Sequence, residues 1–138
     1  MIIMSVDPGH ARTGLAISDS GGFLASSLCV IEEWNDQRLV EKIIAKAREN
    51  AAERIVVGLP RNMDGSEGES ARRARALAAA ITEQSGIPTE MQDERGTTIT
   101  AHAYLSAGEV YGKRRKQKID AVAASIILQD YLDSRRGD

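Results

Sequence analysis

Short apolar segments with the residue types of β-strands open the chain. Residues 2–6 are apolar and favour a first strand, and residues 14–18 and 23–31 favour two more. The turn residues Ser20-Gly21-Gly22 would join the second and third of these as a hairpin. The pattern therefore predicts three antiparallel strands at the start of the chain.

The apolar positions change to a helical period after Asn35, a residue type that commonly caps a helix. Residues 55–57 are apolar again and precede the turn residues Gly58 and Pro60, which predicts a buried strand that Arg54 opens. The helix predicted between Asn35 and this strand has an expected core face that consists of Leu39, Val40, Ile43, Ile44, Ala47 and Ala51.

A second helix is predicted from about Glu67 to Gly86, with Ser66 and Glu69 as a capping box at its start. Residues 87–92 then predict a short strand. The apolar stripe of the second helix consists of Ala71, Ala74, Leu77, Ala78 and Ile81.

The last part of the chain predicts two helices on either side of a basic segment. The first of them passes through Ala101 and Leu105. Residues 111–118 have no apolar periodicity and predict a mobile loop, and the second helix is expected from about residue 117 to residue 133. Its inward-facing residues are expected to be Ile119, Val122, Ala123, Ile126, Ile127 and Tyr131.

Together these elements predict an α/β fold with one mixed five-stranded sheet flanked by helices, because three antiparallel strands precede alternating helices and strands with parallel crossovers. The 138 residues match the size of one domain, so residues 1–138 are expected to form a single domain.

One cysteine excludes an internal disulfide, and the amino terminus shows no basic leader or cleavage site, which predicts a cytoplasmic protein. No apolar segment approaches the roughly 18 residues of a membrane-spanning helix.

Acidic residues follow or adjoin several of the predicted elements. Asp7 ends the first strand, where a carboxylate is costly unless it is paired or holds a cation. Asp93 and Glu94 follow the strand at 87–92, and Asp120 lies in the first turn of the final helix. Ligands gather at the carboxyl ends of strands in such sheets, so these carboxylates could meet at one edge. Taken singly, each also fits a simpler role in a turn, an exposed loop or a helix terminus.

Converging carboxylates in a chain with two histidines and one cysteine favour Mg²⁺ or Mn²⁺ over zinc. Two such ions, about 4 Å apart in known sites, activate a water and stabilise the leaving oxygen of a phosphodiester. The acidic residues therefore point to metal-dependent cleavage of phosphodiester bonds.

Two basic features could hold the phosphates of a substrate. Residues 58–66 lead from a strand to a helix amino terminus, which favours an anion. A turn and a helix cap would explain other residues of this loop but give Arg61 no role. His10, close to Asp7, is a weaker candidate, because a loop histidine is usually only solvated. A basic cluster, which is more often a solvated loop, precedes Asp120 and consists of Lys113, Arg114, Arg115, Lys116 and Lys118.

The net charge of -2 is unusual for a nucleic-acid-binding protein, which normally carries a basic excess. Residues 113–118 hold five basic side chains and no acidic one, which leaves 13 basic against 20 acidic side chains elsewhere. The small net charge therefore results from a basic segment at residues 113–118 and an acidic excess in the rest of the chain. The few aromatic residues are scattered and indicate no base-stacking platform.

Four motifs stand in series along nearly the whole chain. They are Asp7-Pro8-Gly9 with Arg12 and Gly14, Val57-Gly58-Leu59-Pro60 with Met63-Asp64-Gly65-Ser66, Asp93-Glu94-Arg95 with Thr97-Thr98, and Lys118-Ile119-Asp120 with Ala123-Ala124 through Ile127-Leu128-Gln129. Together, and in this order, they resemble the motifs of the YqgF/RuvX family. The resemblance implies a ribonuclease H-like fold, a cytoplasmic bacterial protein, and activity as a Holliday junction resolvase or as a nuclease that matures the 5′ end of pre-16S rRNA.

The same resemblance implies Asp7, Glu94 and Asp120 as the catalytic and metal-binding set, with Asp93 as the alternative to Glu94. Arg12 and Arg95 lie within the motifs and join the expected substrate contacts. The chain departs from the family pattern where His10, Ala11 and Thr13 replace the usual Thr, Lys and Ile, and where Gly96 replaces Leu. These changes remove no carboxylate and bear on substrate affinity.

The expected function is a Mg²⁺- or Mn²⁺-dependent nuclease that acts on structured nucleic acid, as a monomer or homodimer, in ribosome biogenesis. One alternative is a junction resolvase that acts on DNA. Another is a non-catalytic RNA-binding assembly factor that needs only the basic cluster. A third is an actin-like ATP-binding domain, since residues 7–14 resemble a phosphate-binding hairpin.

Overall fold

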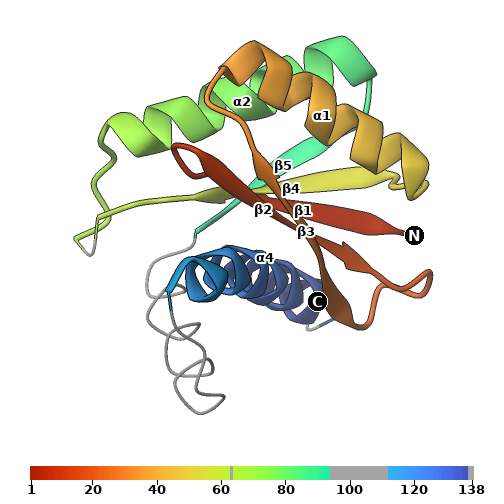
Figure 1. Ribbon diagram of the computed structural model, residues 1–138. Helices are drawn as coiled ribbons and strands as arrows, with labels where there is room; N and C mark the ends of the chain where they lie inside the picture. Colours follow the sequence, from red (N-terminus) through yellow and green to blue (C-terminus); the bar gives the residue numbers. More distant parts are fainter. Residues whose placement is uncertain (63, 94–111, 137–138) are drawn as a thin grey trace.

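A single five-stranded sheet forms the centre of the protein, with helices on both of its faces (Figure 1). The computed structural model describes residues 1–62, 64–93 and 112–136, with the backbone alone at 112–120 and 136. The elements are β1 (Ile3–Asp7), β2 (Arg12–Ser18), β3 (Ala25–Glu32), α1 (Asp36–Glu49), β4 (Arg54–Leu59), α2 (Glu69–Ser85), β5 (Thr89–Asp93) and α4 (Gly112–Arg136).

The strand order β3-β2-β1-β4-β5 places β1 in the middle of the sheet. β2 pairs antiparallel with β1 and β3, whereas β4 pairs parallel with β1 and β5. This confirms the predicted mixed sheet. The strand β3 begins two residues later than predicted, because Asp19 Oδ1 accepts the backbone N–H groups of Phe23 and Leu24 and holds both in the turn.

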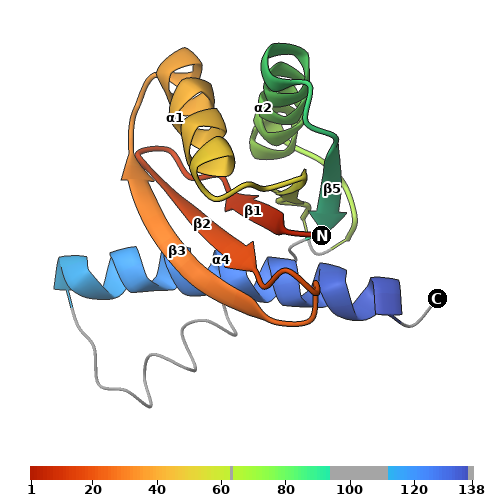
Figure 2. The same ribbon diagram turned by 90° about the vertical axis from the view of Figure 1, so that its right-hand side faces the viewer.

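Two hydrophobic cores lie on the two faces of the sheet. One joins α1 and α2 to residues such as Met4, Val6 and Leu15, and the other joins α4 to Ile3, Ala16 and Val56. Figure 2 shows α1 and α2 side by side on one side of the strands and α4 crossing the other. The alternation of strand side chains therefore assigns each strand residue to one helix layer.

The amino terminus of α1 is capped as predicted, since the Asn35 side chain accepts a hydrogen bond from the Arg38 N–H at 2.9 Å. Ala51 was expected on the buried face but is exposed, because α1 ends before it and its φ of 56° lies in the left-handed region. The remaining predicted residues are buried: Leu39, Val40, Ile43, Ile44 and Ala47.

The Asn35→Ala variant is expected to lose about 1 kcal/mol of unfolding free energy, because the N–H group of Arg38 loses its acceptor. Urea denaturation measures the loss. Asn35→Ser is the matched control, since serine retains a capping oxygen and should stay near wild type. Equal stability of wild type and Asn35→Ala would contradict a capping role.

The capping box predicted for α2 is wrong. The N-cap is Gly68, without a side-chain hydrogen bond, and Ser66 instead donates its hydroxyl to Asp64 Oδ1 at 2.6 Å. The side chains of Asn62, Asp64 and Ser66 are thus linked by hydrogen bonds within the loop. Gly86 ends α2 as predicted, with a φ of 75°, and the predicted stripe is buried: Ala71, Ala74, Leu77, Ala78 and Ile81.

The helix α4 begins at Gly112, so the loop predicted at 111–118 is wrong for residues 112–118. Lysine, arginine and glutamine propagate a helix well, and a missing apolar stripe does not end one. The buried face of α4 is also broader than expected. Ala124, Leu128 and Leu132 are buried beside Ala123, Ile127 and Tyr131, whereas Val122 and Ile126 are half-buried.

Some predictions lie outside the described residues: the helix through Ala101 and Leu105, and the inward-facing side chain of Ile119.

Cys29 is half-buried and packs at the margin of the α1–α2 core, and burial raises the pKa of its thiol. Over the described parts of the chain, no helix is both long and apolar enough to cross a membrane.

Candidate functional site

Asp7 lies at the carboxyl end of the central strand, between two glycines. Gly14 pairs with it across β2, and the pairing of Val6 with Val57 places Gly58 beside it on β4. Neither of these directly paired neighbours carries a side chain, and the Asp7 carboxylate beside them is half-buried. Glycines inside strands mark places where a ligand or another backbone approaches closely.

The Asp7 side chain belongs to the α4 side of the sheet. Ile3 packs in the α4 core, and the Ser5 hydroxyl donates to the Ala124 carbonyl at 2.7 Å. Alternation along β1 assigns Asp7 to this same side, roughly 7 Å beyond Ser5.

The backbone of α4 brings residue 120 toward Asp7. α4 runs antiparallel to β1 beneath the sheet (Figure 1), so its amino-terminal half lies under the carboxyl end of β1. Residue 120 lies one turn, about 6 Å, before Ala124 on the helix, on the side toward the end of β1. The side chain of Asp120 lies outside the described residues, but the fold brings its backbone and that of Asp7 to the same edge.

Asp93 belongs to the opposite side of the sheet. On β5, Glu90 accepts a hydrogen bond from Tyr131 of α4, whereas Met91 packs on the α1–α2 core. Asp93 alternates with Met91 and therefore shares its side, away from Asp7. Gln92 pairs with Gly58 and lies on the same side of the sheet as Asp7. Glu94 lies outside the described residues.

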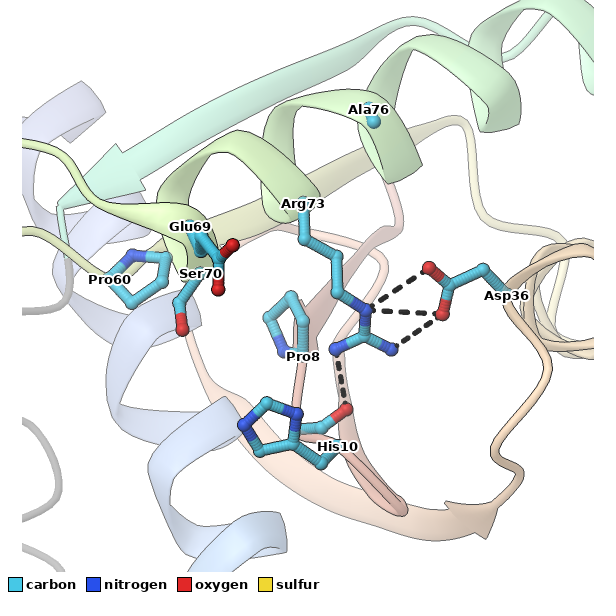
Figure 3. A pocket seen from close by; sticks show the side chains of 9 residues that line it. Pro8, His10, Asp36, Pro60, Glu69, Ser70, Arg73 and Ala76 are labelled. Carbon is cyan, nitrogen blue, oxygen red and sulfur yellow. Dashed lines mark hydrogen bonds and ion pairs between the residues drawn. The ribbon is translucent and has the colours of Figure 1, made fainter.

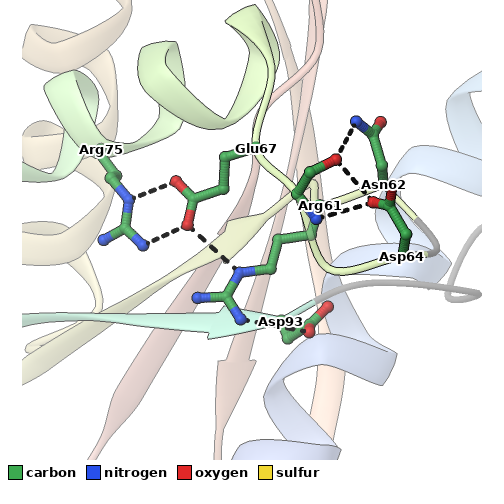
Figure 4. A network of polar contacts seen from close by, with 7 residues as sticks. Arg61, Asn62, Asp64, Glu67, Arg75 and Asp93 are labelled. Carbon is green, nitrogen blue, oxygen red and sulfur yellow. Dashed lines mark hydrogen bonds and ion pairs between the residues drawn. The ribbon is translucent and has the colours of Figure 1, made fainter.

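Arg61 is held between two carboxylates (Figure 4). Its Nε lies 3.4 Å from Glu67 Oε2, and its Nη1 lies 3.9 Å from Asp93 Oδ2. Arg75 completes the network with two hydrogen bonds of 2.8 Å to Glu67, and these hold the pKa of the Glu67 carboxyl below its ordinary value. Arg61, expected from the sequence to contact substrate, is thus engaged in joining the β4–α2 loop to the end of β5.

The other basic residues proposed from the sequence are placed only in part. Arg12 opens β2, half-buried, and alternation with Ala16 assigns it to the α4 side, the same side as Asp7. Arg95 and the side chains of Lys113, Arg114, Arg115, Lys116 and Lys118 lie outside the described residues.

A carboxylate between two strand glycines, with a helix backbone converging on it, fits a small hard cation bound by oxygen ligands. Among the described side chains no group of three or more ligand residues converges, since Glu94 and the Asp120 side chain fall outside that search. Of the three expected carboxylates, Asp7, Glu94 and Asp120, Asp7 is therefore the one whose side chain lies within the described residues.

The three-layer fold, with its antiparallel meander followed by parallel strands, is that of the ribonuclease H-like resolvases. A Thermus thermophilus RuvC structure in complex with a Holliday junction matches 99% of this chain and 96% of its own, with a TM-score of 0.63 and 15% identity. A fowlpox virus resolvase with its junction DNA matches 98% and 99%, with a TM-score of 0.60 and 14% identity.

The chain belongs to the RuvX family, described as Holliday junction resolvase, whose family model matches residues 1–134. A relative from Pelotomaculum thermopropionicum is 43% identical over 136 residues, which is 98% of this chain and 88% of its own. One from Leuconostoc citreum is 40% identical over 141 residues, which is 97% and 96%. Both carry the name of a candidate pre-16S rRNA nuclease.

Proposed function

We propose that this protein is a metal-dependent nuclease that matures the 5′ end of pre-16S rRNA in the cytoplasm. The observation that carries the proposal is the placement of Asp7, at the end of the central strand, between Gly14 and Gly58 and toward α4. The names of the relatives support pre-16S rRNA as the substrate.

Asp7, Glu94 and Asp120 are the proposed ligands of Mg²⁺ or Mn²⁺. When bound, two such ions supply a water nucleophile and stabilise the leaving oxygen of the phosphodiester. Glu94 is proposed in preference to Asp93, because alternation in β5 turns Asp93 to the other layer, where it is engaged by Arg61. The protein's own part is to hold negative oxygen ligands at one edge of a rigid sheet.

Substrate contacts are proposed for Arg12, Arg95 and the basic residues at the start of α4. Cationic side chains there would neutralise backbone phosphates, so binding should weaken as salt rises. Arg61 fits a positioning role better than a phosphate contact, because Glu67 and Asp93 already share its charge.

Holliday junction cleavage is the second candidate, favoured by the family description and by the likeness to RuvC. It requires two active sites, and hence a homodimer, whereas trimming an RNA end needs one. A non-catalytic assembly factor would need the basic residues of α4 and would dispense with Asp7.

The test incubates the purified protein with a pre-16S rRNA 5′ leader and with a four-way DNA junction, with Mn²⁺, with Mg²⁺ and with a chelator. We expect cleavage of the RNA with either ion, none with the chelator, and little cleavage of the junction. Cleavage of the junction in preference to RNA would favour the resolvase. Metal-independent cleavage, or binding of RNA without cleavage, would contradict the proposal.

A further inference from the structure

A cavity of about 650 Å³ lies on the α1–α2 side of the same edge of the sheet (Figure 3). Its walls come from the loop after β1, the loop after β4 and the first turns of α1 and α2. This volume falls within the range of small-molecule sites. Pro8, which lines it, follows Asp7 directly, so the two Cα atoms lie about 3.8 Å apart.

One wall is fixed by Arg73 of α2. Its guanidinium donates to Asp36 Oδ1 at 2.8 Å and to the Gly9 carbonyl at 2.7 Å. These bonds tie the loop after β1 and the start of α1 to α2. The cavity is therefore preformed, with its shape held by three elements.

The charges that line the cavity argue against a phosphate. The positive charge of Arg73 is matched by Asp36, and the Glu69 carboxylate adds a negative charge. Within the described part of the chain, neither Glu69 nor Ser70 has a hydrogen-bond partner for its side chain, and Figure 3 shows both beside the cavity. A neutral group with hydrogen-bond donors suits these walls better than an anion.

The remaining walls suit a flat ring. Pro8 and Pro60 present apolar rings from the loops after β1 and β4, and the exposed imidazole of His10 also lines the cavity. Unpaired bases are commonly held by stacking on aromatic rings, here that of His10, together with hydrogen bonds to their edges, and the proline rings would add apolar contact.

We propose that this cavity binds one nucleoside of the substrate strand, next to the cleaved phosphate, and that Glu69 accepts a hydrogen bond from an amino group of its base. The assignment rests on the proposed nuclease function for its substrate. Pro8 follows Asp7 at the edge of the sheet, so a strand that leaves the cavity has to cross only this edge to bring a phosphate to the Asp7 carboxylate on the α4 side. Cytosine, adenine and guanine carry an exocyclic amino group, whereas uracil offers only a ring N–H between two carbonyl oxygens that repel a carboxylate, so Glu69 would disfavour uridine.

The test is a titration of the ¹⁵N-labelled full chain by NMR with cytidine 5′-monophosphate, uridine 5′-monophosphate or inorganic phosphate, without metal. Cytidine monophosphate should shift the amide signals of Gly9, His10 and Ser70, and uridine monophosphate should bind about tenfold more weakly. Inorganic phosphate should leave these signals unchanged. The indole signal of Trp34, the single tryptophan, gives an isolated reporter two residues from Asp36.

Glu69→Gln should bring the two nucleotide affinities together, because an amide can also donate to the uracil oxygen. Glu83→Gln is the matched control, exposed on the same helix away from the cavity, and should keep the preference for cytidine.

Equal affinities in the wild type, shifts caused equally by inorganic phosphate, or no shifts at these residues would overturn the assignment. The titration involves no cleavage, so it separates two failures. Nucleotide binding by a protein that cleaves no leader RNA would count against the nuclease proposal alone. Cleavage without nucleotide binding would count against the cavity assignment alone.

Discussion

Asp7→Asn should slow cleavage of the pre-16S leader RNA about a thousandfold, because bound metal supplies several kcal/mol of transition-state stabilisation. Asparagine keeps the size of the side chain and removes the negative charge that attracts the cation. Its cross-strand neighbours Gly14 and Gly58 carry no side chain that the substitution would displace. Single-turnover cleavage at saturating Mg²⁺ measures the effect, and circular dichroism checks the fold.

Asp130→Asn is the matched control for this variant. Asp130 is exposed on α4, ten residues along the helix from position 120, and its replacement should leave the cleavage rate close to that of wild type. Undiminished cleavage by Asp7→Asn would exclude Asp7 from the catalytic site. Equal losses in both variants would indicate a general effect of carboxylate removal.

Leu128→Ala should lower the free energy of unfolding by about 2–5 kcal/mol, the range for large-to-small changes in a packed core. Leu128 is fully buried between α4 and the sheet, in the core that fixes α4 beneath β1. Chemical denaturation with urea measures the change.

Leu24→Ala is its control, because the Leu24 side chain is 67% exposed and its hydrogen bond to Asp19 uses the backbone. We expect a change within about 0.5 kcal/mol for this variant. A loss at Leu128 no larger than that at Leu24 would contradict the packing of α4 against the sheet.

Much of the fold could be predicted from local patterns. The apolar stripe of α1 apart from Ala51, the apolar stripe of α2 and the αL glycine at position 86 depend on nearby residues, and the structure confirms them. The position of Asp7 at a strand end was equally visible, because its strand is short and apolar.

The predictions that were wrong or left open concern residues whose contacts cannot be read from the local pattern. Ser66 has the spacing of a capping residue, yet Asp64 takes its hydroxyl within the loop. Arg61 looks unused in the sequence, but Glu67 and Asp93 lie on both sides of it in space.

Two further features required the sheet register. Whether Asp93 shares a side with Asp7 depends on how β5 pairs with β4, which no local pattern specifies. The cavity brings residues 8–10 against the start of α2, and the sequence showed no signal for Glu69 or Ser70 as lining residues.

Binding of Mn²⁺ to the protein without substrate tests the central claim most directly, because that claim is a metal centre built on Asp7. A calorimetric titration should show Mn²⁺ binding to wild type and to Asp130→Asn, and a loss of that binding in Asp7→Asn. Equal Mn²⁺ binding by all three proteins would contradict the account.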